Sequence, residues 1–183
     1  MKNILKGSTT YLVGPIQYKD GSLWRQQIES QLKPMGIRIF NPYNHPFINS
    51  RQEACGDTQQ ELKKMAAEGK YDELSVIMKQ IRREDLACVD LSTFIIAYID
   101  TSVYTCGTWE EIFWANRLKR PIFLICEQGK QNLPLWMFGT IPHKYVYNTF
   151  DEVINVLKKI DSGEIEISSD RWKILRQEFL CNS

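Results

Sequence analysis

One glutamate near the start of a predicted helix is well placed for nucleophilic chemistry. Residues 107–115 read Gly-Thr-Trp-Glu-Glu-Ile-Phe-Trp-Ala, so a glycine-threonine turn precedes two adjacent carboxylates. Glu110 and Glu111 would lie about 100° apart around the helix, which lets one face a cleft and the other face solvent. Acidic residues in a first helical turn are also favoured by the helix dipole alone. The segment therefore indicates either a catalytic carboxylate, Glu111, or only a well-formed helix start.

Other segments add groups that could work with Glu111. A Tyr-x-x-Gly-Pro motif (Tyr11, Gly14, Pro15) ends the first apolar run, and Asp85 precedes the most apolar run of the chain. Together with Gly107-Thr108-x-x-Glu111-x-x-x-Ala115, this constellation resembles the nucleoside 2-deoxyribosyltransferase family in order and spacing. The resemblance runs from about residue 9 to residue 147.

The resemblance implies a role for each matching residue. Glu111 is similar to the family's nucleophilic glutamate, which attacks the anomeric carbon of the sugar. Asp85 matches the aspartate that handles the proton of the nucleobase, and Tyr11 matches a tyrosine that orients the nucleophile. Asn132 resembles the asparagine that one subunit lends to its neighbour's site. The remaining expected substrate-binding residues are Gly14, Pro15, Thr105, Gly107 and Thr108.

These residue types suit glycosyl transfer. A carboxylate can trap an oxocarbenium-like carbon covalently and so divide one difficult displacement into two easier ones. A second carboxyl group then gives a proton to the departing base and recovers it from the incoming one, as in retaining glycosidases. The resemblance implies no organic cofactor and no metal.

Several of these residues also have ordinary structural interpretations. Asp85 lies in Arg-Arg-Glu-Asp, which could be a solvated helix face, and Asp90 is an alternative acid nearby. Tyr11 could be a strand residue whose hydroxyl only forms a structural hydrogen bond, and Asn132 could be an ordinary loop residue.

Thr105 departs from the family pattern. Many family members carry an aspartate six residues before the nucleophile, where it contacts the 5′-hydroxyl of the sugar. The related deoxynucleoside 5′-monophosphate N-hydrolases have a serine there, and a hydroxyl tolerates a phosphate that a carboxylate would repel. Our leading interpretation is 2-deoxyribosyl transfer between nucleobases, with hydrolysis of 2′-deoxynucleoside 5′-monophosphates as the alternative. A non-catalytic nucleotide-binding module is the alternative of another class.

Alternating apolar runs and helical patterns would bring these residues to one edge of a sheet. Strands are expected at 9–16, 37–40, 93–99, 122–126 and 144–147, and helices at 22–33, 59–89, 109–119, 133–138 and 150–160. The pattern predicts an α/β fold with a doubly wound, mostly parallel five-stranded sheet and helices on both faces, which the resemblance makes flavodoxin-like. Ligands bind beyond the carboxyl ends of such strands.

Composition bounds the remaining possibilities. The 183 residues carry 23 basic and 22 acidic side chains, which argues against binding nucleic acid or membranes through bulk charge. Five scattered cysteines and two histidines predict neither a disulfide framework nor a metal site. With no long apolar run, the chain is expected to be cytoplasmic. Residues 1–160 are expected to form a deoxyribosyltransferase-like domain, and 161–183 an extension that packs on it or on a partner subunit. The expected partners are a small nucleoside or nucleotide, a nucleobase and further copies of the chain, which share active sites.

Overall fold

A five-stranded parallel sheet forms the centre of the molecule. The structure, a computed structural model, describes residues 2–16, 21–44 and 56–165. The strands follow the order β2-β1-β3-β4-β5, and each neighbouring pair is parallel. This order is that of a flavodoxin-like sheet, so the predicted fold is confirmed. The strands are β1 (Thr9–Val13), β2 (Arg38–Phe40), β3 (Phe94–Tyr98), β4 (Ile122–Ile125) and β5 (Val146–Tyr147).

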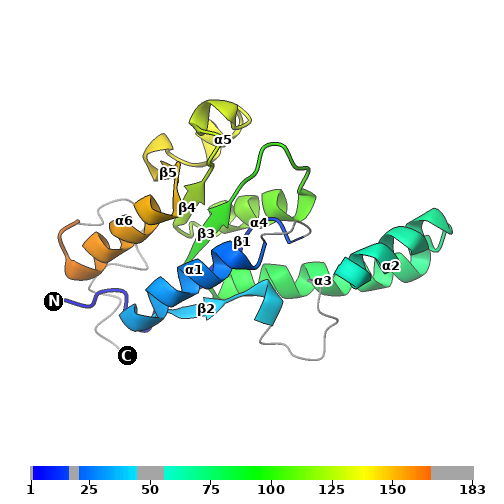
Figure 1. Cartoon of the computed structure of the whole chain (residues 1–183), viewed down its shortest axis with the longest axis horizontal. Coiled ribbons are helices and arrows are strands. Elements are labelled where there is room, and N and C mark those ends of the chain that lie inside the picture. Colours follow the sequence, from blue (N-terminus) through cyan, green and yellow to red (C-terminus); the bar gives the residue numbers. More distant parts are fainter. Residues whose placement is uncertain (1, 17–20, 45–55, 166–183) are drawn as a thin grey trace.

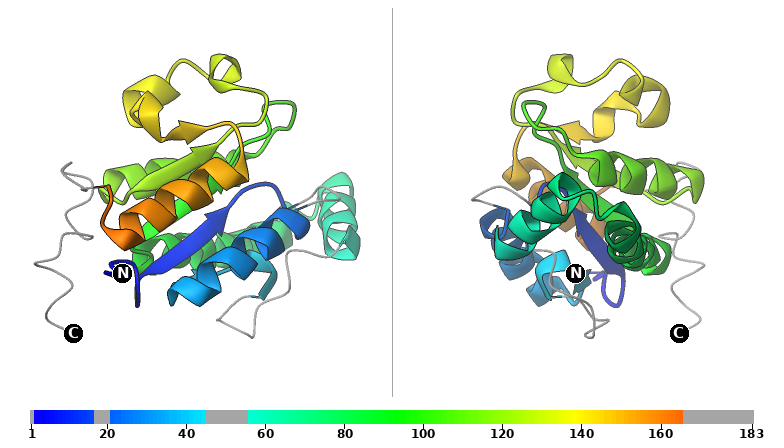
Figure 2. Two further views of the ribbon diagram at one scale, coloured as in Figure 1. Left: turned by 60° about the vertical axis from the view of Figure 1, so that its left-hand side comes forward. Right: turned by 90° about the vertical axis from the view of Figure 1, so that its right-hand side faces the viewer.

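Helices cover both faces of this sheet (Figures 1 and 2). α1 and α6 pack on one face, and α3 and α4 pack on the other. The helices are α1 (Leu23–Leu32), α2 (Gly56–Ala67), α3 (Tyr71–Leu91), α4 (Cys106–Arg117), α5 (Met137–Thr140) and α6 (Phe150–Ser162).

Strand periodicity explains this two-faced core. Successive side chains of a strand point to opposite faces, so Leu12 joins α1 and α6, while Tyr11 and Val13 join α3 and α4. β3 repeats the division with Phe94 and Ile95. Because both faces are covered, β3 and β4 are nearly all apolar rather than alternating, whereas β1 also carries Thr9, Thr10 and Tyr11 and β2 begins with the exposed Arg38.

Local signals fix the ends of several helices. Thr149 and Glu152 form a capping box at the start of α6, and Gly163 ends that helix in the left-handed conformation. Gly36 does the same after the 3₁₀ turn Lys33–Met35, which follows α1. Ser22 occupies the N-cap position of α1, but its side chain accepts no capping hydrogen bond.

The sequence-based boundaries were wrong in places. α4 begins at Cys106, so Gly107 and Thr108 lie inside its first turn and not in a turn before it. The first turn tolerates glycine because its backbone N–H groups have no partner within the helix. α2 begins at Gly56 instead of residue 59. The last strand has only two residues, because a 3₁₀ turn occupies His143–Tyr145. α5 begins at Met137, later than the expected helix at 133–138.

α2 and the first half of α3 form a hairpin that projects beyond the sheet (Figure 1). Gly69 lies in the turn between these two helices and has a positive φ of 74°. No helix in the described part of the chain is long and apolar enough to cross a membrane. The expected C-terminal extension lies outside the described residues from 166 onward, and α6 ends at Ser162.

Candidate active site

A cleft lies beyond the carboxyl ends of β1 and β3, where the switch in strand order predicts a binding site. Its volume is about 380 Å³. The loop after β1, the middle of α3 and the start of α4 supply its walls. The lining residues are Gly14, Pro15, Ile16, Met78, Asp85, Tyr104, Thr105, Cys106, Gly107, Thr108 and Glu111.

The Tyr11 hydroxyl connects the two carboxylates of this cleft. It lies 2.8 Å from Glu111 Oε1 and 3.1 Å from Asp85 Oδ1. These residues come from β1, α3 and α4, and 100 positions separate the tyrosine from the glutamate. The three residues expected to share catalysis therefore meet at one phenol oxygen, although their roles stay predictions.

Tyr11 is held as a neutral hydrogen-bond donor. Its ring and hydroxyl are buried, and burial raises the pKa of the phenol well above its usual value. The negative charges of Glu111 and Asp85 raise this pKa further. Because the hydroxyl carries one proton, it donates to one carboxylate at a time. The shorter contact is to Glu111, which is itself buried, with 7% of its surface exposed.

The adjacent glutamate has a different environment. Both carboxylate oxygens of Glu110 accept hydrogen bonds from the Arg82 guanidinium, across the gap between α4 and α3. The Arg82 hydrogen bond and charge hold the pKa of Glu110 below its usual value. The two neighbours thus separate as the helix geometry predicted, with Glu111 in the cleft and Glu110 on the outer surface.

A second link joins α3 and α4 at their other end. The Trp114 indole donates to Asp90 Oδ1 at 2.8 Å, and the Arg120 guanidinium donates to the Asp90 carbonyl at 2.8 Å. Asp90 therefore ties α4 and the turn after it to α3, and Asp85 is the acid that faces the cleft. Together the two links fix the helices that carry Asp85 and Glu111.

Close packing shapes the wall formed by the loop after β1. A Cβ atom at Gly14 would lie 3.0 Å from the Trp24 ring and 3.1 Å from the Tyr98 carbonyl oxygen. Such approaches are tighter than ordinary van der Waals contact. Glycine therefore lets the loop lie close to β3, and Pro15 follows it at the edge of the cleft.

The start of α4 forms the opposite wall. Thr105 occupies its N-cap position without a side-chain capping bond, and Gly107 and Thr108 follow in the first turn. The backbone N–H groups of a first turn lack intrahelical partners and favour electronegative ligand atoms. This end of the cleft can thus receive a hydroxyl or a phosphate oxygen.

The structure places Asn132 apart from the others. It lies in the 3₁₀ turn Lys130–Asn132, and its amide donates to the Gln128 carbonyl. It does not line the cleft of its own chain. Its expected reach into a neighbouring subunit stays a prediction.

Four lining residues were not identified from the sequence: Ile16, Met78, Tyr104 and Cys106. Ile16 adjoins the Gly-Pro motif, and Tyr104 and Cys106 flank Thr105. Their positions beside predicted site residues could have indicated that they line the cleft. Met78 had no such signal, because its place depends on how tertiary packing brings that turn of α3 beside the loop after β1.

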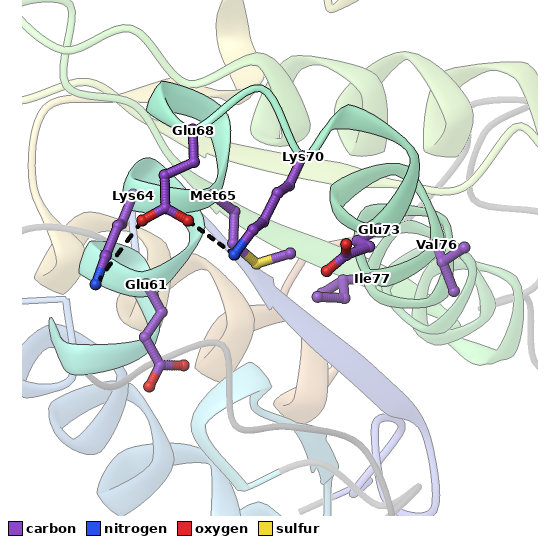
Figure 3. Close-up of a pocket in the computed structure, with 8 residues that line it drawn as sticks. All are labelled: Glu61, Lys64, Met65, Glu68, Lys70, Glu73, Val76 and Ile77. Atoms are coloured by element: carbon purple, nitrogen blue, oxygen red, sulfur yellow. Dashed lines mark ion pairs between the residues drawn. The ribbon is translucent and has the colours of Figure 1, made fainter.

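Another hollow lies between α2 and α3, away from the sheet, and Figure 3 shows its lining. Glu68 pairs there with Lys64 and Lys70 across the turn between the helices. These pairs are exposed and span only a few positions, which is typical of a helical hairpin surface. Within the described ranges, no group of three or more His, Cys, Asp or Glu side chains could hold a metal ion.

The fold resembles solved structures at low sequence identity. The 2-deoxyribosyltransferase of Bacillus psychrosaccharolyticus is 15% identical, with 81% of this chain and 91% of that chain covered and a TM-score of 0.54. A conserved protein from Enterococcus faecalis V583 is 19% identical, with coverage of 83% and 98% and a TM-score of 0.51. A CMP N-glycosidase of Clostridium botulinum is 16% identical, with coverage of 82% and 98% and a TM-score of 0.49. No protein-family model and no curated protein matches the sequence. The chain therefore has the fold of a 2-deoxyribosyltransferase, in agreement with the fold that its motifs implied.

Proposed function

We propose that the protein cleaves the N-glycosidic bond of 2′-deoxyribonucleosides and transfers the deoxyribosyl group to a second nucleobase. One observation carries the proposal. The Tyr11 hydroxyl oxygen lies 3.1 Å from Asp85 Oδ1 and 2.8 Å from Glu111 Oε1, so these two carboxylate oxygens are at most about 5.9 Å apart. Retaining glycosidases separate their carboxyl groups by about 5–5.5 Å, whereas inverting enzymes need about 6.5–9.5 Å to admit a water. The short separation supports attack by a carboxylate.

The proposed reaction has two steps. Glu111 attacks C1′ of the sugar, the bond from C1′ to the base nitrogen breaks, and the electron pair leaves with the base as Asp85 supplies a proton. An incoming base then attacks C1′, returns its proton to Asp85 and releases the Glu111 carboxylate. Tyr11 donates to Glu111 between these events and holds it in one orientation.

The likeness to the 2-deoxyribosyltransferase of known structure supports the same class of reaction, but a shared fold does not determine function. The hydrogen-bonded carboxylates argue against the non-catalytic nucleotide-binding module. A binding protein has no need of two carboxylates beside one buried phenol, since bringing them together is costly.

Product analysis tests the reaction directly. The protein is incubated with each deoxyribonucleoside, with and without a second base, and products are separated by chromatography. We expect a new nucleoside only when the second base is present. Binding without any released base in every mixture would favour the non-catalytic module instead.

Covalent labelling tests the nucleophile. A 2′-fluoro-2′-deoxyribonucleoside slows the second step and should leave a sugar on Glu111, detected by mass spectrometry of peptides. Glu111→Gln should abolish labelling and turnover, whereas Glu110→Gln, which removes the adjacent carboxylate, should retain labelling and lose only the few fold in kcat/KM that breaking the Arg82 link costs. Labelling of Glu110 would refute the assignment.

Thr105 favours hydrolysis of deoxynucleoside 5′-monophosphates as a second candidate. Its side chain lines the cleft and does not cap α4, so the hydroxyl is available to a ligand group. If it admits a 5′-phosphate, Thr105→Asp should shift preference toward the nucleoside by about 1–4 kcal/mol. Thr101→Asp, in the same loop but outside the lining, is the control. An unchanged preference in Thr105→Asp would leave the nucleoside as the substrate.

We also propose that the sites are shared between subunits. The segment after Asn132 exposes Leu135, Trp136 and Phe138, with 84%, 78% and 43% of their surfaces accessible. Aromatic residues are enriched in the centres of interfaces. Sedimentation should therefore show a dimer or larger assembly. If Asn132 serves a neighbour, mixing inactive Glu111→Gln with inactive Asn132→Ala should restore part of the activity, and an active monomer would contradict sharing.

A further inference from the structure

The loop that forms one wall of the cleft rests on a buried arginine. Arg25 lies in the first turns of α1 and has no exposed surface. Its Nε donates to the Leu12 carbonyl at 3.2 Å, and its terminal nitrogens donate to Gly14 at 2.8 Å and Pro15 at 3.1 Å. A further bond reaches the Gly21 carbonyl. One guanidinium thus binds backbone on both sides of the segment that connects β1 to α1.

Aromatic rings enclose the same guanidinium. Its carbon lies 4.3 Å from the centre of the Trp24 ring and 5.3 Å from that of Tyr43. Such contacts stabilise a desolvated cation. The Tyr43 hydroxyl also donates to the Ile16 carbonyl at 2.8 Å, so a residue that follows β2 holds the loop as well.

The packing at Gly21 shows how closely these groups fit. A Cβ atom there would lie 2.5 Å from the Tyr43 hydroxyl oxygen and 2.9 Å from the Pro15 carbonyl oxygen. Such distances are too short for non-bonded carbon and oxygen atoms. The backbone at Gly21 therefore approaches the loop as only glycine allows, which brings its carbonyl within reach of Arg25.

Burying a charged guanidinium is costly, and a well-packed apolar side chain often serves stability as well or better. The arginine does what an apolar residue cannot. The several N–H donors of its planar guanidinium bind several carbonyl groups at once and so fix their directions. With the carbonyls of Gly14 and Pro15 turned toward α1, the opposite side of this backbone lines the cleft.

We propose that Arg25 is a positioning residue for substrate binding, which acts by fixing the Gly14–Pro15–Ile16 wall. The proposal rests on the proposed function and adds a residue that does not touch the substrate. Tyr11, Asp85 and Glu111 are held by the sheet and by the links between α3 and α4. Loss of Arg25 should therefore weaken contacts made equally in the ground and transition states, which raises KM and leaves kcat nearly unchanged.

Arg25→Lys tests the multiple hydrogen bonds of the guanidinium. Lysine keeps the positive charge, but its single ammonium group cannot bind all of these carbonyl groups at the same time. We expect KM for the nucleoside that the wild type uses to rise on the order of tenfold, with kcat within about threefold. Tyr43→Phe, which removes the hydroxyl that donates to Ile16, should raise KM by a smaller factor. Arg117→Lys, an exposed residue of α4, is the matched control and should behave as wild type. A fall in kcat with an unchanged KM would overturn the proposal.

Amide hydrogen exchange of the free protein, followed by NMR, tests positioning without any substrate. Exchange at Gly14, Ile16 and Gly21 should accelerate in Arg25→Lys and stay unchanged in β3 and β4. Wild-type exchange at these amides would overturn the proposal. If Arg25→Lys does not fold, Tyr43→Phe decides by the same two measurements. If the wild type releases no base from any nucleoside, the proposed function fails, and the exchange experiment alone decides the role of Arg25.

Discussion

The two halves of α3 differ sharply although they belong to one continuous helix. The second half, from Ile81 to Leu91, packs on the sheet, carries Asp85 and binds α4 through Arg82 and Asp90. The first half projects with α2 beyond the sheet and exposes apolar side chains: 68% of Tyr71, 68% of Val76 and 41% of Met78 are accessible.

The contrast shows what makes a carboxylate useful. Asp72 and Asp85 are both acids of α3. Asp72 lies in the first turn of the helix, beyond the sheet, where the helix dipole stabilises a negative charge. Asp85 meets a buried phenol and a second acid because the sheet lies beneath it. The packing partner, and not the helix itself, turns one of these acids into a candidate catalyst.

The largest expected effect distinguishes these two aspartates. Asp85→Asn removes the proposed proton donor and should lower kcat/KM for nucleosides by about 10²–10⁴-fold, the range for general acid catalysis. Asp72→Asn should leave kcat/KM as in the wild type. With substrates whose bases are better leaving groups, kcat/KM of Asp85→Asn should come closer to that of the wild type, because such bases need less protonation to leave. Equal losses in both variants would remove the distinction between the halves.

Two valines compare packing in the two halves. Val89 is fully buried and Val76 is 68% exposed. Val89→Ala should lower the free energy of unfolding by about 1.5–3 kcal/mol through lost burial and the remaining cavity. Val76→Ala should change it by less than about 0.5 kcal/mol, since alanine is also the better helix former. Urea denaturation measures both values, and a large loss in Val76→Ala would mean that the first half is covered by another chain.

The thiol of Cys88, in the second half of α3, should make the free energy of unfolding depend on pH. Burial, followed by the charges of Asp85 and Glu111, raises its pKa to about 12. The folded protein keeps a proton that the unfolded chain loses above about pH 8.5, so this stabilisation is complete below that pH and is lost as pH rises toward 12. Between pH 8 and pH 10 the unfolding free energy should thus fall more steeply in the wild type than in Cys88→Ala, by about 2 kcal/mol. Cys106→Ala controls for removing a thiol, and parallel slopes for Cys88→Ala and wild type would contradict the burial.

Ion pairs provide the smallest expected contrast. Arg82→Gln breaks the link to Glu110 and should lower kcat/KM by a few fold, because α3 and α4 would hold Asp85 and Glu111 less firmly. Lys70→Gln breaks the pair with Glu68 in the projecting half and should not change kcat/KM. Steady-state kinetics of the two variants measures the difference. An effect from Lys70→Gln would show that the hairpin contributes to the site.

Much of this architecture follows from the sequence. The runs at 9–16, 93–99 and 122–126 predicted buried parallel strands, and the structure has slightly shorter strands at Thr9–Val13, Phe94–Tyr98 and Ile122–Ile125. Glycine and proline marked most of the turns. The motif residues Tyr11, Asp85 and Glu111 were identified as a set through the family resemblance that their order and spacing carry, because each one alone has an ordinary structural explanation.

Other features depend on contacts that no local pattern encodes. The start of α4 at Cys106 was missed because Gly107 reads as a turn, although a first helical turn accepts it. Met78, one turn before Ile81 in α3, lines the cleft because tertiary packing brings that turn beside the loop after β1 and the start of α4. Arg25 looks like one more surface charge in the sequence, and its burial is evident only once the carbonyls of the loop converge on it.

The wide separation of Tyr11 and Glu111 along the chain has a consequence for how the protein reaches its active form. Their hydrogen bond joins residues 100 positions apart, and the bond to Asp85 spans 74. Contacts this distant form late, after the intervening chain has lost most of its freedom. A nascent chain that ends before α4 lacks the nucleophile, and one with β1 detached lacks the phenol that orients it. Both hydrogen bonds must form before the site is complete, so the proposed glycosidic cleavage should require the fully folded chain.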